Sequence, residues 1–173
     1  MNIVKDTTMP DTFGKPPSRE LSSIDEIVIH HTEGDGNWKG LLSWYLQAND
    51  KRKAMYEKFV ALTHFYIQKD GKIIQAYPLE TWMYHSCSGK RDKTTIGIEL
   101  FHLSGDFTEQ QYESLFWLLF EYLPTVCPNT KIISSHDYRY KKYSNKTKRC
   151  PSEFFDWNKL INANNKGWEV HTI

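Results

Sequence analysis

Two histidines and one cysteine follow ordered stretches of the sequence, and together they have the composition of a catalytic zinc site. The β-branched run 27–29 ends in His30, and the apolar pair 132–133 leads through two serines to His136. Cys150 follows after a segment rich in Lys, Tyr, Ser and Asn. Zn²⁺ accepts two nitrogens and one sulfur, and three protein ligands leave a fourth tetrahedral position for water. These residues therefore predict a metal centre capable of hydrolysis.

Glu99 and Lys148 are the candidate catalytic residues beside such a metal. Glu99 interrupts the apolar run 94–101, where a carboxylate seldom lies without a partner. It could be a general base that takes a proton from water, or an ion-paired structural residue. Lys148 lies two residues before Cys150, which would bring its ammonium near the metal to stabilise an oxyanion. The alternative is a solvated lysine in the basic segment 139–149.

Four further residues are candidates for contact with a substrate. His31 adjoins His30, and neighbouring residues of an extended chain face opposite sides. We therefore expect His31 to order the surroundings of the metal or to touch the substrate. The aromatic stretch 78–91 provides Trp82, Tyr84 and His85 as groove residues, although a place in the core explains Trp82 equally well.

The elements that must position these residues follow from apolar periodicity and turn signals. Strands are predicted over 24–29, 60–68, 72–77, 94–101 and 131–135, and helices over 38–48, 108–122 and 154–161. Thr108 and Gln111 have the spacing of a capping box, and Pro124 is expected to end that helix. We predict one catalytic domain over 24–162, between an extended N-terminal arm (1–23) and a C-terminal tail (163–173). The segment between His136 and Cys150 is expected to be a loop.

Composition limits the possible partners and the cellular location. The 173 residues carry 22 Lys and Arg against 21 Asp and Glu, so no strong field favours nucleic acid or an anionic membrane. There is no apolar run long enough for a bilayer, and the first residues lack the apolar core of a secretory signal. We expect a cytoplasmic, monomeric protein as synthesised, unless another protein releases it.

Three cysteines are an odd number, which excludes a full disulfide framework. Cys87 and Cys127 could pair only by leaving Cys150 unpaired. This count fits a metal thiolate at Cys150.

Six short motifs occur in order between residues 24 and 160: 27–32, 63–67 with Asp70-Gly71, 84–86, 95–99, 135–136 and 148–151. In residue type and order they resemble the zinc-dependent N-acetylmuramoyl-L-alanine amidases of type 2. This family includes phage lysozymes, wall-recycling amidases and peptidoglycan recognition proteins. The resemblance implies an α/β fold in which a central mixed sheet is flanked by helices. It also implies a groove at one face, where His30, His136 and Cys150 hold Zn²⁺.

The activity that this resemblance implies is hydrolysis of the amide bond between N-acetylmuramic acid and L-alanine in peptidoglycan or muropeptides. Glu99 matches the catalytic glutamate of the wall-recycling branch, which commonly has aspartate where Cys150 stands. Thr63 occupies the place of a tyrosine in the phage-lysozyme branch. Two alternatives stay open: a peptidoglycan-binding module without activity, and a phage protein with a second role as inhibitor of a host enzyme.

Overall fold

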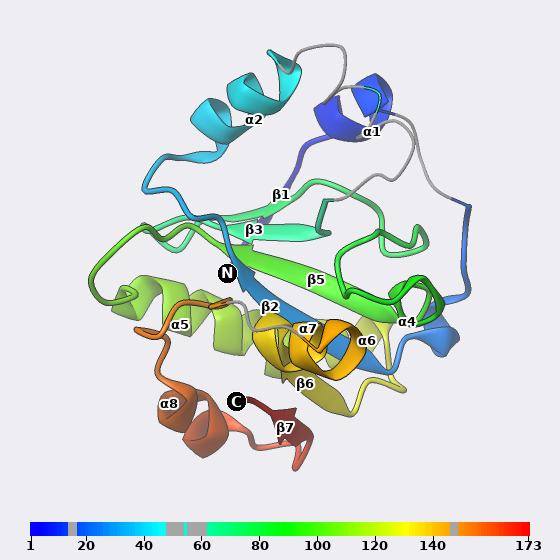
Figure 1. Ribbon diagram of the computed structural model, residues 1–173, viewed down its shortest axis with the longest axis vertical. Helices are drawn as coiled ribbons and strands as arrows, with labels where there is room; N and C mark the ends of the chain where they lie inside the picture. Colours follow the sequence, from blue (N-terminus) through cyan, green and yellow to red (C-terminus); the bar gives the residue numbers. More distant parts are fainter. Residues whose placement is uncertain (14–16, 48–53, 55–61, 146–148) are drawn as a thin grey trace.

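The protein is an α/β domain with a seven-stranded mixed sheet, seen in a computed structural model that describes residues 1–13, 17–47, 54, 62–145 and 149–173 (Figure 1). The strands are β1 (Ile3–Lys5), β2 (Glu26–His31), β3 (Phe65–Ile67), β4 (Ile73–Gln75), β5 (Thr95–Leu100), β6 (Ile132–Ser135) and β7 (Glu169–His171). Their order is β1-β4-β3-β5-β2-β6-β7. Of these neighbours only β3 and β4 are antiparallel, so the mixed sheet implied by the resemblance is confirmed.

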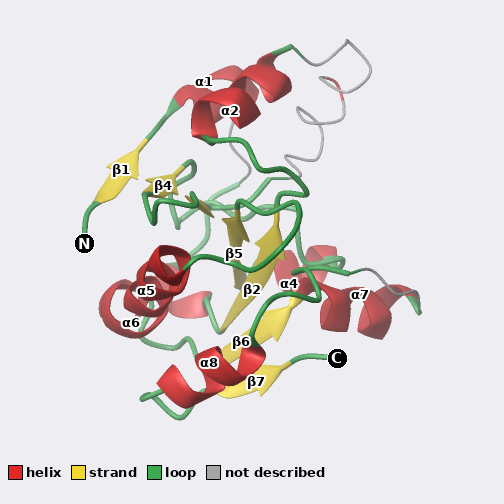
Figure 2. Ribbon diagram, turned by 90° about the vertical axis from the view of Figure 1, so that its left-hand side faces the viewer, coloured by secondary structure: helices red, strands yellow, loops and turns green. Residues whose placement is uncertain are grey.

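Helices cover both faces of the sheet. They are α1 (Thr8–Phe13), α2 (Trp38–Leu46), α4 (Gly89–Asp92), α5 (Glu109–Trp117), α6 (Leu123–Val126), α7 (His136–Ser144) and α8 (Trp157–Ala163). A 3₁₀ turn covers Leu21–Ser23, and a π-helical stretch, Leu118–Tyr122, joins α5 to α6. Figure 2 shows α5, α6 and α8 on one side of the sheet and α4 and α7 on the other, with α1 and α2 together at one end.

The two faces of the central strands differ in character, and this difference positions the site. Ile96, Ile98 and Leu100 of β5 are fully buried and belong to the larger apolar core, which also includes the apolar residues of α5. Side chains alternate along a strand, so Gly97 and Glu99 face the opposite side. The side chain of Glu99 therefore lies on the face of the sheet that also carries α4 and α7.

The predicted capping box is confirmed, whereas the predicted end of that helix is not. The hydroxyl of Thr108 accepts the N–H of Gln111, and the Gln111 side chain accepts the N–H of Thr108, which completes the capping box. Pro124 does not end this helical run, which continues to Val126. Pro124 lies in the first turn of α6, where the missing N–H and the fixed φ of proline are tolerated.

Two segments that were expected to lack regular structure are ordered. The N-terminal arm prediction is wrong for 1–13, because β1 pairs in parallel with β4 and Met9 of α1 is fully buried. The prediction of a loop after His136 is wrong as well, because α7 begins at that residue. Ser135 caps α7 by accepting the N–H of Tyr138, and two lysines in its last turn complement the helix dipole.

Among the described residues, no helix combines the length and the apolar character needed to cross a membrane.

Candidate active site

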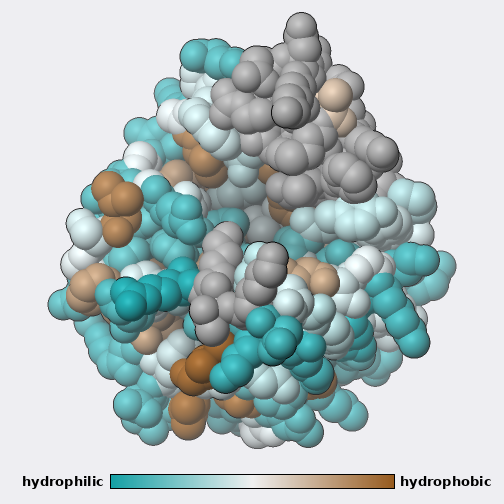
Figure 3. All heavy atoms as spheres, in the orientation of Figure 1, coloured by the Kyte–Doolittle hydropathy of each residue, from teal (hydrophilic) through white to brown (hydrophobic). Residues whose placement is uncertain are grey.

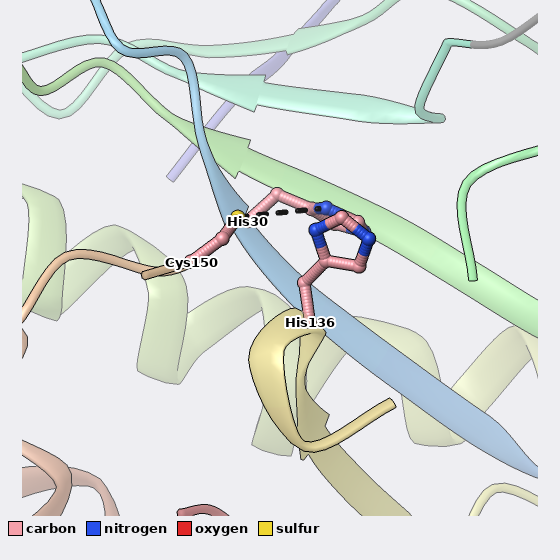
Figure 4. Close-up of side chains that lie close together, drawn as sticks. All are labelled: His30, His136 and Cys150. Carbon is pink, nitrogen blue, oxygen red and sulfur yellow. Dashed lines mark hydrogen bonds between the residues drawn. The ribbon is translucent and has the colours of Figure 1, made fainter. Parts of the chain in front are cut away.

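His30, His136 and Cys150 converge at one edge of the sheet. Strands β2 and β6 are adjacent and parallel, so the carboxyl end of each points to the same edge. His30 lies at the end of β2, and His136 follows β6 as the first residue of α7. Figure 4 shows these two rings and the Cys150 thiol turned toward a common point.

The three side chains fit a zinc ion in donor type and in spacing. One donor atom from each lies within 4.8 Å of the others, and Nδ1 of His30 lies 3.9 Å from Sγ of Cys150. In tetrahedral zinc sites, bonds of about 2.0–2.3 Å place neighbouring ligand atoms roughly 3.3–3.8 Å apart. Small movements would bring the three atoms to that spacing. All three residues are at least nine-tenths buried.

The far sides of both histidine rings contact further polar side chains. Nε2 of His30 lies 3.1 Å from Nδ1 of His85, whose own Nε2 lies 3.1 Å from the Thr95 hydroxyl. Nε2 of His136 lies 3.1 Å from Sγ of Cys87. Burial holds the pKa of His85 well below its usual value, and nearby positive charge adds to the effect. His85 is therefore neutral at physiological pH, and its Nδ1 can accept a hydrogen bond from the Nε2–H of His30.

An ion-pair network connects α7 to the start of β2. The Glu26 carboxylate accepts hydrogen bonds from Arg139, Arg91 and Ser134, and Glu26 and Arg139 are both almost fully buried. Burial alone would raise the pKa of Glu26, but the Ser134 hydroxyl and the two arginines outweigh it and lower the pKa. Arg139 also donates to the Ser86 hydroxyl at 3.2 Å. Glu26 is thus a charged residue that positions α7, and with it His136.

Glu99 lies beside the three convergent residues. It is the register partner of His30 on the adjacent strand β5, so both side chains lie on the same face of the sheet. Both line a pocket of about 450 Å³ that also includes His31 and Tyr84. Figure 3 shows that the molecule is hollowed near the centre of this face, between the parts that carry α2 and α7.

Of the other predicted site residues, the structure describes Trp82 and His85. Trp82 is outside the residues that line it, and its ring packs edge-on against Tyr84 with the centroids 4.7 Å apart. His85 lines the pocket but is buried against His30. Lys148 lies outside the described residues.

The comparisons with known proteins agree with this geometry. The family model for N-acetylmuramoyl-L-alanine amidase matches residues 20–153, which is well over half of the chain. The chain belongs to this amidase family. The match covers the three convergent residues and Glu99. No curated protein matches the chain.

Solved structures of similar proteins share the fold across nearly the whole chain. N-acetylmuramoyl-L-alanine amidase LysC from Clostridium intestinale URNW is 23% identical, with a TM-score of 0.60 over 96% of this chain and 97% of that one. The hydrolase AmiA of Staphylococcus aureus, solved with its ligand, is 18% identical, with a TM-score of 0.64 over 96% and 83%. The recognition protein PGRP-SA of Apis mellifera is 13% identical, with a TM-score of 0.67 over 93% and 95%. At these identities the likeness shows the fold alone.

Two features of this site were not predicted from the sequence. Cys87 is predicted only as a possible disulfide partner, and none of the three cysteines forms a disulfide. Its position directly after the motif 84–86, two residues after His85, is a signal that could have found it. Gly97 was overlooked as well, although a Cβ there would lie 2.7 Å from the Thr63 methyl and 2.9 Å from Nδ1 of His85. Glycine at this position lets both side chains pack over β5.

Proposed function

We propose that this chain is a zinc-dependent hydrolase that cleaves the amide bond between N-acetylmuramic acid and L-alanine in peptidoglycan or in soluble muropeptides. The observation that carries the proposal is the convergence of His30, His136 and Cys150 within a chain of the amidase family. Members of a family that only bind peptidoglycan have no need of a complete set of metal ligands. The presence of all three donors here supports an enzyme rather than a binding module.

The residues of the chain divide the work of hydrolysis between them. His30, His136 and Cys150 would hold Zn²⁺, which would polarise the lactyl carbonyl and lower the pKa of a water in the site to about 7. Glu99 is the general base: its carboxylate takes the proton from the attacking water and passes it to the amine of L-alanine as that amine leaves. The place of Glu99 beside His30 in the same pocket supports this role.

Other side chains would bind the substrate and stabilise charge. Lys148 is proposed to stabilise the negative charge that develops on the carbonyl oxygen, where one such donor is typically worth a factor of about 10²–10³ in rate. His31 and Tyr84 line the pocket and are proposed to contact the sugar or the stem peptide. His85 is proposed to act through His30, since its ring is buried against that residue.

Product analysis of digested peptidoglycan tests the proposal. Purified sacculi treated with the protein should release new alanine amino termini and no new reducing sugar ends. A glycosidase would give the opposite result, and it would need two carboxylates flanking the glycosidic bond. A chelator control and the Cys150→Ser variant should both abolish the new amino termini. If neither product formed from sacculi or from soluble muropeptides, the binding-module alternative would replace the proposal.

A further inference from the structure

The segment from His85 to Cys87 contacts the ring of each histidine ligand on the side away from the metal position. His85 Nδ1 lies 3.1 Å from Nε2 of His30, and Cys87 Sγ lies 3.1 Å from Nε2 of His136. In metal sites the second ring nitrogen of a ligating histidine almost always donates its proton to an acceptor that fixes the tautomer and the orientation of the ring. One short segment therefore offers an acceptor to both rings.

The backbone holds Cys87 in a conformation that cysteine seldom adopts. Its φ is 63°, in the left-handed region that glycine occupies at no steric cost. The residues before it are anchored, because Asp92 accepts the N–H of His85 at 3.1 Å and that of Ser86 at 2.7 Å. Arg139 donates a hydrogen bond to the Ser86 hydroxyl. A strained residue next to a metal ligand points to a role for the side chain that it presents.

We infer that Cys87 is a positioning residue for His136. Its sulfur accepts a hydrogen bond from the Nε2–H of His136, so that Nδ1 of this ring faces the metal. The inference rests on the proposed function, because it requires a metal at the His30, His136 and Cys150 side chains. With Cys87 in this role, Cys150 is the single sulfur ligand, and the fourth coordination position of the metal stays open to water. This role also makes metal binding sensitive to modification of Cys87, since this thiol is exposed whereas Cys127 and Cys150 are buried.

Zinc affinity of matched variants tests this role. Cys87→Ala keeps the Cβ and the strained backbone but removes the acceptor, so the zinc dissociation constant should rise about 10–100-fold. Cys87→Ser keeps an acceptor and should recover most of the affinity. Ser88→Ala, in the same loop, is the control, because this serine caps α4 without a side-chain hydrogen bond. Competition with a chromophoric chelator measures all four proteins, and thermal unfolding of the metal-free forms checks that each is folded.

The number of sulfur ligands separates a positioning residue from a fourth metal ligand. X-ray absorption of the zinc-loaded wild-type protein should show one sulfur at about 2.3 Å. The Cys87→Ser protein should show the same single sulfur. Two sulfurs in the wild-type protein and one in the variant would overturn the inference, because Cys87 would then bind the metal directly.

Alkylation of the exposed thiol gives an independent test in the wild-type fold. N-ethylmaleimide forms a bond between Sγ of Cys87 and one alkene carbon, and the thiol proton ends on the other alkene carbon. The metal-free protein should take up one label, and its zinc affinity should fall at least about ten-fold. The Cys87→Ser protein should take up no label and keep its affinity.

These outcomes separate the inference from the proposed function. A wild-type protein that binds no zinc would overturn the metal centre and, with it, the role of Cys87. If the wild-type protein binds zinc, and Cys87→Ala and the alkylated protein bind it with the same affinity, the role of Cys87 alone would be overturned.

Discussion

Replacing Gly97 by alanine should lower both the stability of the fold and the zinc affinity of the site. Gly97 lies in the middle of β5, and the added Cβ would meet the Thr63 methyl at 2.7 Å and Nδ1 of His85 at 2.9 Å. The backbone cannot move away easily, because the Gly97 carbonyl accepts the N–H of His64 and its N–H donates to Nδ1 of that residue. The side chains of Thr63 and His85 must therefore shift.

The size of the effect follows from this crowding. Overpacking a well-packed interior typically costs about 1–3 kcal/mol. The lower backbone entropy of alanine in the unfolded chain offsets ~0.4–1 kcal/mol of that. A net loss of ~1–2 kcal/mol corresponds to a decrease in Tm of roughly 2–8 °C for a protein of this size. Displacement of His85 from His30 should also weaken zinc binding about 10–100-fold.

Thermal unfolding with and without zinc measures both effects. Gly36→Ala is the matched control, because a Cβ at that position meets nothing within 4 Å. Adding Thr63→Ser to Gly97→Ala removes the methyl of the closest contact and should restore part of the lost stability. An unchanged Tm together with unchanged zinc affinity in Gly97→Ala would refute the packing described here.

Three further predictions concern the charged and metal-binding residues. Glu99→Gln keeps the size of the side chain but removes the proton acceptor, so turnover in a muropeptide assay should fall roughly 10²–10⁴-fold while zinc stays bound; near-normal turnover would return Glu99 to a structural role. Cys150→Ser should lower the zinc content from about one per chain, measured by metal analysis, and leave the far-ultraviolet circular dichroism unchanged. Glu26→Gln should cost about 3–5 kcal/mol at pH 7, because Arg139 then stays buried without a carboxylate. The pKa of Glu26 is lowered from 4.5 in the folded state, so its contribution is fully present above about pH 4.5 and is lost as the pH falls below that value. Chemical denaturation should show the wild type and Glu26→Gln converging in acid, and a difference independent of pH would contradict this assignment.

The sequence predicts the centre of the sheet well because the pattern there has a single physical explanation. Apolar, β-branched runs such as 27–29 are suited to buried parallel strands, and a polar residue that ends such a run must lie at the sheet edge. The convergence of His30 and His136 follows from this rule once β2 and β6 are neighbours. That pairing joins two strands that are far apart in the sequence, and only the family resemblance predicts it.

Other parts could not be predicted because they depend on tertiary contacts. The helix α7 is highly polar, and its stability comes from the Ser135 cap and from the pairing of Arg139 with Glu26 on a distant strand. Strand β1 is stabilised by its pairing with β4 rather than by its own short pattern. The role inferred for Cys87 depends likewise on a contact across 49 residues of sequence, which residue spacing does not reveal.

The most direct test of amide hydrolysis is the fate of the oxygen from water. A soluble muropeptide would be digested by the zinc-loaded protein in ¹⁸O-labelled water, and the products analysed by fragmentation mass spectrometry. We predict one ¹⁸O atom in the lactyl carboxylate of N-acetylmuramic acid and an unlabelled peptide that begins with a free L-alanine amine. Label at the anomeric carbon of a newly cut sugar, or in a carboxylate of the peptide, would contradict the proposed amidase activity.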